Sequence, residues 1–174
     1  MTTIVAVKHA GHTAIAGDGQ VTLGEKYIMK GTAQKVRSIY HDSVVIGFAG
    51  GVADAFTLQD WLEKKLESYS GDLRRAAVEL AQDWRKDPTL QKLEAMLIAM
   101  DKDNLLVISG SGEVIDPDDD VVAIGSGGNF AQAAAIAMNE HAAAMTAEDI
   151  AKAAVNIAAN IDVYTNHNVI AKSF

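Results

Sequence analysis

The sequence predicts an α+β fold, arranged as a four-layer α-β-β-α sandwich, from the order of its patterned segments. Along the 174 residues, two blocks of short strands alternate with two pairs of helices. Two packed antiparallel sheets, each covered on its outer face by one helix pair, account for this order. A doubly wound parallel sheet would need a crossover helix after each strand, whereas five strands are predicted before the first helix.

The composition fits one domain over residues 1–174, because 49% of the chain is apolar and no linker rich in Gly, Ser or Pro divides it. The absence of cysteine excludes disulfides, thiolate metal sites and cysteine nucleophiles. A net charge of -8 argues against a nucleic-acid partner. No apolar run approaches the roughly 18 residues of a membrane span, and no signal peptide is visible. We therefore expect a cytoplasmic protein with no membrane partner.

The first strand block is predicted from short alternating or apolar runs. These runs cover residues 3–7, 13–16, 27–29, 36–40 and 44–49. Their short connections leave no room for crossover helices, so mostly antiparallel pairing is expected.

Two helices are predicted to follow the first strand block. Asp54 is expected to cap the first helix, and Gly71 to end it. Its apolar residues recur at helical spacing: Phe56, Leu58, Trp61, Leu62 and Leu66. The second helix ends before Pro88, and its predicted buried stripe is Leu73, Ala76, Ala77, Leu80 and Trp84.

The second half of the chain repeats the pattern. Strands are predicted at 95–100, 105–109 and 121–125, helices at 130–141 and 146–159, and a final strand pair at 163–165 and 168–171. The last helix opens with Thr146 and Asp149 at the spacing of a capping box. The acidic run at 116–120 is interpreted as a solvated turn, because it lacks the spaced oxygen ligands of a calcium loop.

Thr2 is the first candidate for chemistry, because it stands directly behind Met1 at the start of an alternating strand. If Met1 is removed, Thr2 carries a hydroxyl nucleophile and a free α-amino group that can act as its base. The pKa of such an amine is roughly 7.7 to 8.0, close to the working pH at which a general base is most effective. The alternative is an ordinary first strand in which Thr2 is incidental.

Three further residues fit Thr2 chemically. Asp18 lies in a Gly-Asp-Gly turn, Lys35 precedes a strand, and Gly50 lies in the glycine turn at 47–51. Lys35 would favour the neutral amine of Thr2 by like-charge proximity, and Asp18 would keep Lys35 charged. A backbone N–H near Gly50 would face an oxyanion. Each residue also has a simpler interpretation. Asp18 can be part of an ordinary tight turn, Lys35 a solvated charge, and Gly50 a position that only needs a flexible backbone.

The glycine turn at 125–128 matches no nucleotide motif. A dinucleotide fingerprint would need glycine where Phe130 stands, and a P-loop would need Gly-Lys-Ser/Thr. A hydrolase nucleophile elbow around Ser126 would need glycine at Ile124, so Ser126 is not expected to be the primary nucleophile. The competing function is a non-catalytic α/β binding module that uses this turn as an anion site at a helix N-terminus. The five histidines form no metal-ligand spacing, and we assign them no chemistry.

Over essentially the whole chain, the sequence resembles the proteasome-related peptidase family. The matching stretches are TTIV at 2–5, AGDGQ at 16–20, MKG at 29–31, KVR at 35–37, GFAGG at 47–51, ADAFTL at 53–58, KLEA at 92–95, AIGSGG at 123–128 and YTN at 164–166. The resemblance implies an N-terminal-nucleophile hydrolase with the four-layer sandwich. It also implies a threonine-type endopeptidase in which Thr2 Oγ attacks a peptide carbonyl and the Thr2 amine is the base.

The resemblance also implies roles for other residues. Lys35 and Asp18 would tune the Thr2 amine, Gly50 would donate its N–H to the oxyanion, and the Ser126 hydroxyl would bond the terminal amine. The backbone carbonyls of three residues match positions that bind a sodium ion in relatives: Ala159, Asp162 and Thr165. Many relatives have Gly and Cys at the first two of these positions. Asp162 also resembles a carboxylate that proteasome β subunits place near their threonine.

The resemblance further implies an assembly. It predicts a homododecamer of two stacked six-subunit rings, with active sites facing an inner chamber. A hexameric ATPase partner would unfold protein substrates, feed them to the chamber and activate the peptidase in its ATP-bound state. No cofactor is implied for the chemistry, because ATP would be used by the partner.

Overall fold

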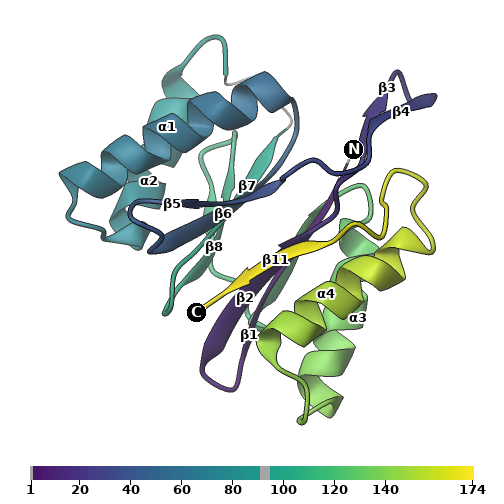
Figure 1. The fold of residues 1–174 in the computed structure, drawn as a ribbon. Coiled ribbons are helices and arrows are strands. Elements are labelled where there is room, and N and C mark those ends of the chain that lie inside the picture. Colours follow the sequence, from purple (N-terminus) through teal and green to yellow (C-terminus); the bar gives the residue numbers. More distant parts are fainter. Residues whose placement is uncertain (1, 91–94) are drawn as a thin grey trace.

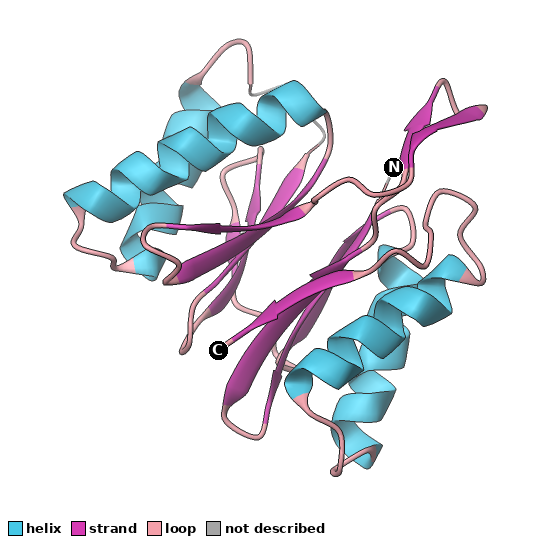
Figure 2. Ribbon diagram, viewed as in Figure 1, coloured by secondary structure: helices cyan, strands magenta, loops and turns pink. Residues whose placement is uncertain are grey.

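The computed structural model describes residues 2–90 and 95–174 and places them in two facing sheets with helices outside (Figure 1). Helices α1 (Val52–Ser68) and α2 (Leu73–Lys86) cover one sheet, and α3 (Gly128–His141) and α4 (Ala147–Ala159) cover the other. The predicted order of layers is therefore confirmed, as the colouring by element makes plain (Figure 2).

The first sheet has the strand order β10-β1-β2-β11. Its strands are β1 (Thr3–His9), β2 (His12–Gly17), β10 (Val121–Gly125) and β11 (Ile170–Ser173). All three pairings are antiparallel, and at the start of β1 Thr3 lies opposite Gly125 while Ile4 lies opposite Gly17. This register brings the turn after β2 and the turn after β10 to either side of Thr2.

The second sheet has the order β5-β6-β7-β8-β9, again with antiparallel pairings. Its strands are β5 (Val36–Ile39), β6 (Val44–Ala49), β7 (Met96–Met100), β8 (Leu105–Ser109) and β9 (Val114–Ile115). A separate hairpin consists of β3 (Val21–Leu23) and β4 (Tyr27–Lys30). The sequence patterns did not predict β3 and β9, since two or three residues are too few to show a period of two.

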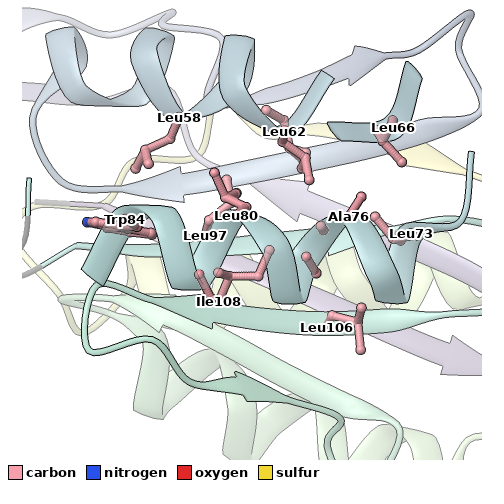
Figure 3. Close-up of a cluster of buried hydrophobic side chains, with 14 of the residues drawn as sticks. Leu58, Leu62, Leu66, Leu73, Ala76, Leu80, Trp84, Leu97, Leu106 and Ile108 are labelled. Carbon is pink, nitrogen blue, oxygen red and sulfur yellow. The ribbon is translucent and has the colours of Figure 1, made fainter. Parts of the chain in front are cut away.

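Three buried clusters separate the four layers. Between α1, α2 and their sheet, the cluster is rich in leucine and includes Leu80 and Trp84 (Figure 3). Between α3, α4 and the other sheet, the cluster is rich in alanine and includes Ala154. A third cluster, which includes Ile4 and Ile98, fills the space between the sheets. Because β1 is covered on both faces, all of its residues from Thr3 to Val7 are buried.

The helix ends differ in how well they were predicted. Thr146 and Asp149 form the predicted capping box at the start of α4. The prediction that Asp54 caps α1 is wrong, because Gly51 is the N-cap residue and Asp54 lies in the first turn. Phe56, one of the apolar residues at helical spacing, is 48% exposed, and the Arg37 guanidinium lies over its ring at 4.3 Å. The predicted stripe of α2 is buried throughout.

The predicted strand at 163–165 is wrong, because these residues form a turn anchored by Asp162. The Thr165 N–H donates to the Asp162 carbonyl at 3.1 Å, and the Tyr164 N–H donates to the Asp162 side chain at 3.3 Å. A carboxylate that bonds the backbone two residues later competes with strand pairing. No helix among the described residues is long and apolar enough to cross a membrane.

Candidate active site

Thr2 lies at the buried start of β1, with 5% of its surface exposed. Its backbone N–H donates to Ser126 Oγ at 3.2 Å, and its carbonyl accepts a hydrogen bond from the Gly127 N–H at 3.5 Å. Gly125 has a φ of +96°, and a Cβ atom there would lie 2.0 Å from the Thr2 carbonyl oxygen. Glycine is therefore required at this position. The turn at 125–128 binds the chain's own Thr2, which leaves little support for the anion-binding module.

Asp162 is the centre of a hydroxyl network beside Thr2. Its Oδ2 accepts hydrogen bonds from Ser126 Oγ at 2.7 Å and from Thr165 Oγ1 at 2.6 Å. Thr165 Oγ1 also lies 2.7 Å from Thr3 Oγ1. The backbone nitrogen of Thr2 is thus connected through Ser126 to a carboxylate. This network uses the Asp162 side chain, whereas the predicted ion site would use its carbonyl.

The carboxylate of Asp18 accepts four hydrogen bonds, and the residue is 1% exposed. Its Oδ1 accepts from Lys35 Nζ at 2.9 Å and from the Thr3 N–H at 3.0 Å. Its Oδ2 accepts from the backbone N–H groups of Gln20 and Asn166, at 2.9 and 3.3 Å. Lys35 Nζ and the N–H of Thr3, the residue after Thr2, therefore bond the same carboxylate oxygen.

Lys35 is an enclosed cation and not the solvated charge of the simpler interpretation, because only 11% of its side chain is exposed. Burial lowers the pKa of Lys35 below its ordinary value of 10.5, and the nearby carboxylates of Asp18 and Asp162 oppose that change. Its charge is therefore lost at a lower pH than that of an exposed lysine, and Asp18 is the main group that maintains it.

Gly50 lies outside this network, in the turn between β6 and α1. Its φ of +152° and the nearby Phe48 ring, which a Cβ atom would approach to 2.8 Å, both demand glycine. Among the described residues it makes no hydrogen bond to Thr2, Ser126 or Lys35. It follows a strand of the five-stranded sheet, whereas Thr2 precedes β1 and Ser126 follows β10 of the four-stranded sheet.

The three predicted ion ligands lie close together in sequence, with Ala159 at the end of α4 and Asp162 and Thr165 in the turn after it. The Asp162 carbonyl accepts the Thr165 N–H, whereas no described N–H donates to the carbonyls of Ala159 or Thr165. Unpaired backbone carbonyls are the oxygen ligands that hard cations prefer, so the residues fit a sodium ion. Among the described residues there is no cluster of three His, Cys, Asp or Glu side chains that could hold a metal.

Sequence reasoning missed two residues of this site, Thr3 and Asn166. Thr3 bonds Asp18 through its backbone and Thr165 through its hydroxyl. Asn166 bonds Asp18 from 148 positions away along the chain. The YTN stretch at 164–166 was the available signal, but it gave no partner for the amide. Met1 and most of the KLEA stretch at 92–95 lie outside the described residues.

The sequence matches one protein family over nearly its whole length and has close relatives in that family. A family model described as "Proteasome subunit" matches residues 1–173. The "ATP-dependent protease subunit HslV" of Lacticaseibacillus casei strain BL23 is 79% identical over 174 residues, which cover 100% of both chains. The protein of the same description from Ligilactobacillus salivarius strain UCC118 is 71% identical over 98% of this chain and 97% of its own.

Solved structures agree with the sequence relatives. The "Crystal structure of eukaryotic HslV from Trypanosoma brucei" has a TM-score of 0.92 and 47% identity, covering 99% of this chain and 98% of that one. "Thiobacillus denitrificans BPH" has a TM-score of 0.78 at 19% identity and covers 99% of this chain and 97% of that one. The second likeness shows a shared fold only.

Proposed function

Because this chain belongs to the proteasome subunit family and groups within it with the HslV subunits of ATP-dependent proteases, we propose that Thr2 is its catalytic nucleophile. The chain is a threonine-type peptidase subunit. Removal of Met1 would turn the Thr2 backbone nitrogen into a free amine. This amine takes the proton of the Thr2 hydroxyl as Oγ attacks the scissile carbonyl, and then gives the proton to the leaving amine. Water hydrolyses the resulting ester and regenerates Thr2.

The surrounding residues take complementary roles in this proposal. Lys35 favours the neutral, basic form of the Thr2 amine, and Asp18 keeps Lys35 charged. Ser126 hydrogen-bonds the amine and orients its lone pair. Gly50, from the facing sheet, donates its N–H to the oxyanion that forms on the substrate carbonyl.

The observation that carries the proposal is the position of the Thr2 nitrogen. It lies 3.2 Å from Ser126 Oγ, and the N–H of the next residue, Thr3, donates to the Asp18 oxygen that also accepts from Lys35 Nζ. A free amine at this point meets a hydroxyl and a neighbouring cation, which are the groups needed to orient it and to lower its proton affinity.

The test combines N-terminal mass spectrometry with a peptidase assay. We expect the active protein to begin at Thr2 and to cleave a fluorogenic peptide. A covalent adduct of an electrophilic peptide inhibitor is expected on Thr2 itself. Full activity of protein that retains Met1, or an adduct on another residue, would contradict the mechanism.

The assembly is proposed at two levels. The chain forms an oligomeric ring that works with an HslU ATPase, and the finer proposal is two stacked hexamers capped by hexameric HslU. Enclosure of the sites has a physical reason, since an unselective peptidase free in the cytoplasm would cleave its neighbours. Sedimentation of the purified chain tests the number of subunits, and a species smaller than twelve subunits at working concentration would refute the double ring.

The partner is also proposed to activate the site. A partner that binds the aligned arrangement of Thr2 and Gly50 more tightly shifts the population toward it, and a 100-fold activation needs only about 2.7 kcal/mol of differential binding. The assay compares the chain alone, with HslU and ADP, and with HslU and ATP on a small peptide that needs no unfolding. Equal rates in all three would leave the partner as an unfoldase only.

A sodium ion is proposed as a structural ligand of the loop after α4, held by the carbonyls of Ala159, Asp162 and Thr165. Bound sodium would stabilise the turn that presents the Asp162 carboxylate to Ser126. Ligand binding to the folded state raises the melting temperature. We expect a higher melting temperature in sodium chloride than in choline chloride at equal ionic strength, and equal values would argue against the ion.

A further inference from the structure

Asn166 connects three chain segments around the Asp18–Lys35 pair. Its Oδ1 accepts a hydrogen bond from the Gly19 N–H at 3.1 Å, and its Nδ2 donates to the Gly31 carbonyl at 2.9 Å. Its backbone N–H donates to Asp18 Oδ2 at 3.3 Å. One residue therefore links the turn after β2, the loop before β5 and the loop before β11.

The first two of these segments carry the ion pair. Gly19 follows Asp18 directly, and Gly31 lies four residues before Lys35. The segments also touch through their backbones, since the Ala33 N–H donates to the Gly19 carbonyl at 2.9 Å. A Cβ atom on Gly19 would lie 2.5 Å from the Gly31 oxygen. The Asn166 amide spans this contact, so its position is coupled to both ends of the ion pair.

We propose that Asn166 is a positioning residue for the reaction, which fixes the backbone on both sides of the Asp18–Lys35 pair and so sets where the Lys35 ammonium lies relative to Thr2. The inference rests on the proposed function. The residue type follows from the two partners, because Gly19 offers a donor and Gly31 an acceptor. A primary amide supplies one acceptor and one donor at this spacing, whereas a carboxylate supplies acceptors only.

Asn168 provides a matched control. Its Nδ2 donates to the same Gly31 carbonyl at 2.7 Å, and its side chain bonds neither Gly19 nor Asp18 among the described contacts. Replacing Asn168 with Ala removes an amide from Gly31 while leaving the contacts of Asn166 with Gly19 and Asp18. A general loss of support for the Gly31 loop would therefore affect both variants, whereas a positioning role affects Asn166 alone.

The experiment measures kcat and KM for a fluorogenic peptide in the complete complex with HslU and ATP. Asn166→Ala is expected to lower kcat about tenfold or more, because small misplacement of a catalytic group is costly. KM should stay within about twofold, since Asn166 is proposed to act on the reacting groups and not on peptide binding. Asn168→Ala should leave both constants within about twofold of wild type. Melting temperatures show whether each variant folds.

The pH dependence of kcat provides a second test, because a purely structural role of Asn166 would not shift it. Lys35 lies near the carboxylates of Asp18 and Asp162. In the proposed mechanism it also acts on the Thr2 amine, so loss of its charge is expected on the alkaline limb of kcat. Asn166→Ala loosens Asp18, so the ammonium is less stabilised and the limb moves to lower pH. Asn166→Asp adds a carboxylate beside Asp18, so the limb moves to higher pH while kcat still falls.

The outcomes separate this inference from the proposed function. If wild type cleaves the peptide and Thr2→Ala does not, but Asn166→Ala keeps its kcat and its alkaline limb, the positioning role is refuted. If Asn166→Ala does not fold, the nearly isosteric Asn166→Asp variant is measured instead. A wild-type kcat and an unshifted alkaline limb of kcat in Asn166→Asp would also refute the positioning role. Full activity of Thr2→Ala would instead overturn the proposed function.

Discussion

The two halves of the molecule are packed with side chains of different size. Leucines and Trp84 fill the space between α1, α2 and the five-stranded sheet (Figure 3). Alanines dominate between α3, α4 and the four-stranded sheet. Small side chains let a helix backbone approach a sheet closely and leave few rotamers to adjust, so the alanine-rich half holds its loops with little freedom. That half carries Thr2, Ser126 and Asp162.

The leucine-rich half contributes different parts of the site. Lys35 precedes β5 and Gly50 follows β6, both on the five-stranded sheet. The candidate nucleophile and its hydroxyl network thus come from one half, and the cation and the candidate oxyanion donor from the other. Alignment of the site therefore depends on how the two sheets face each other, and variants in each half should affect the reaction differently.

The largest effect is expected at Thr2 in the alanine-rich half. Thr2→Ala removes the nucleophile and should lower kcat by about 10⁴-fold or more, as for other enzymes that lose a covalent nucleophile. Thr2→Ser keeps the hydroxyl and the amine and should retain part of the activity. Peptidase assays of both variants, with circular dichroism as a check of folding, measure this. Activity of Thr2→Ala near that of wild type would rule out the mechanism.

The next effect is expected at Lys35, the contribution of the other half. Lys35→Ala should lower kcat by about 10²-fold or more, because the charge beside the Thr2 amine is lost. Lys35→Arg should also be impaired, since a planar guanidinium differs in shape and hydration from a compact ammonium. The measurement is kcat for each variant. Wild-type kcat in both variants would show that Lys35 has no role in the reaction.

Core substitutions test the difference in packing directly. Leu80→Ala opens a cavity in the leucine-rich cluster and should lower the free energy of unfolding by about 2–5 kcal/mol. Ala154→Leu overfills the alanine-rich cluster and should cost about 1–3 kcal/mol. Because α4 leads into the Asp162 turn, Ala154→Leu should also reduce kcat, whereas Leu80→Ala should change kcat less. The reverse order of effects on kcat would show that the alanine-rich half does not position the site.

The smallest effect is expected in the pH dependence of stability. The folded protein lowers the pKa of Lys35, so between that lowered pKa and 10.5 the unfolded chain binds more protons than the folded one. Stability contributed by this group therefore rises with pH across that window. Lys35→Met should abolish the rise, which denaturant titrations at several alkaline pH values measure. A difference between wild type and Lys35→Met that does not change with pH would refute the burial effect.

The sequence was most informative where local patterns act alone. The capping box at Thr146, the α2 stripe and the limits of β6 were predicted because each depends on neighbours within a few residues. The order of strand blocks and helix pairs predicted the layers for the same reason. Phe56 keeps the helical spacing but lies outside the core, and that spacing cannot show that Arg37, from β5, covers its ring.

For the site, the residue types could be read from the sequence: a threonine behind Met1, an aspartate between glycines, a lysine before a strand and glycine turns. Their pairing was only a chemical expectation until the packed structure provided the contacts. Asp18 joins Lys35 and the Thr3 N–H, and Asn166 reaches Asp18 across 148 positions, because strand register sets these distances. A carboxylate of Asp162 near the threonine was implied by the family resemblance, but its bonds to Ser126 and Thr165 depend on the turn found in place of the predicted strand at 163–165. Hydrogen bonds between distant segments leave no periodic trace in a sequence, so only the packed sheets could reveal them.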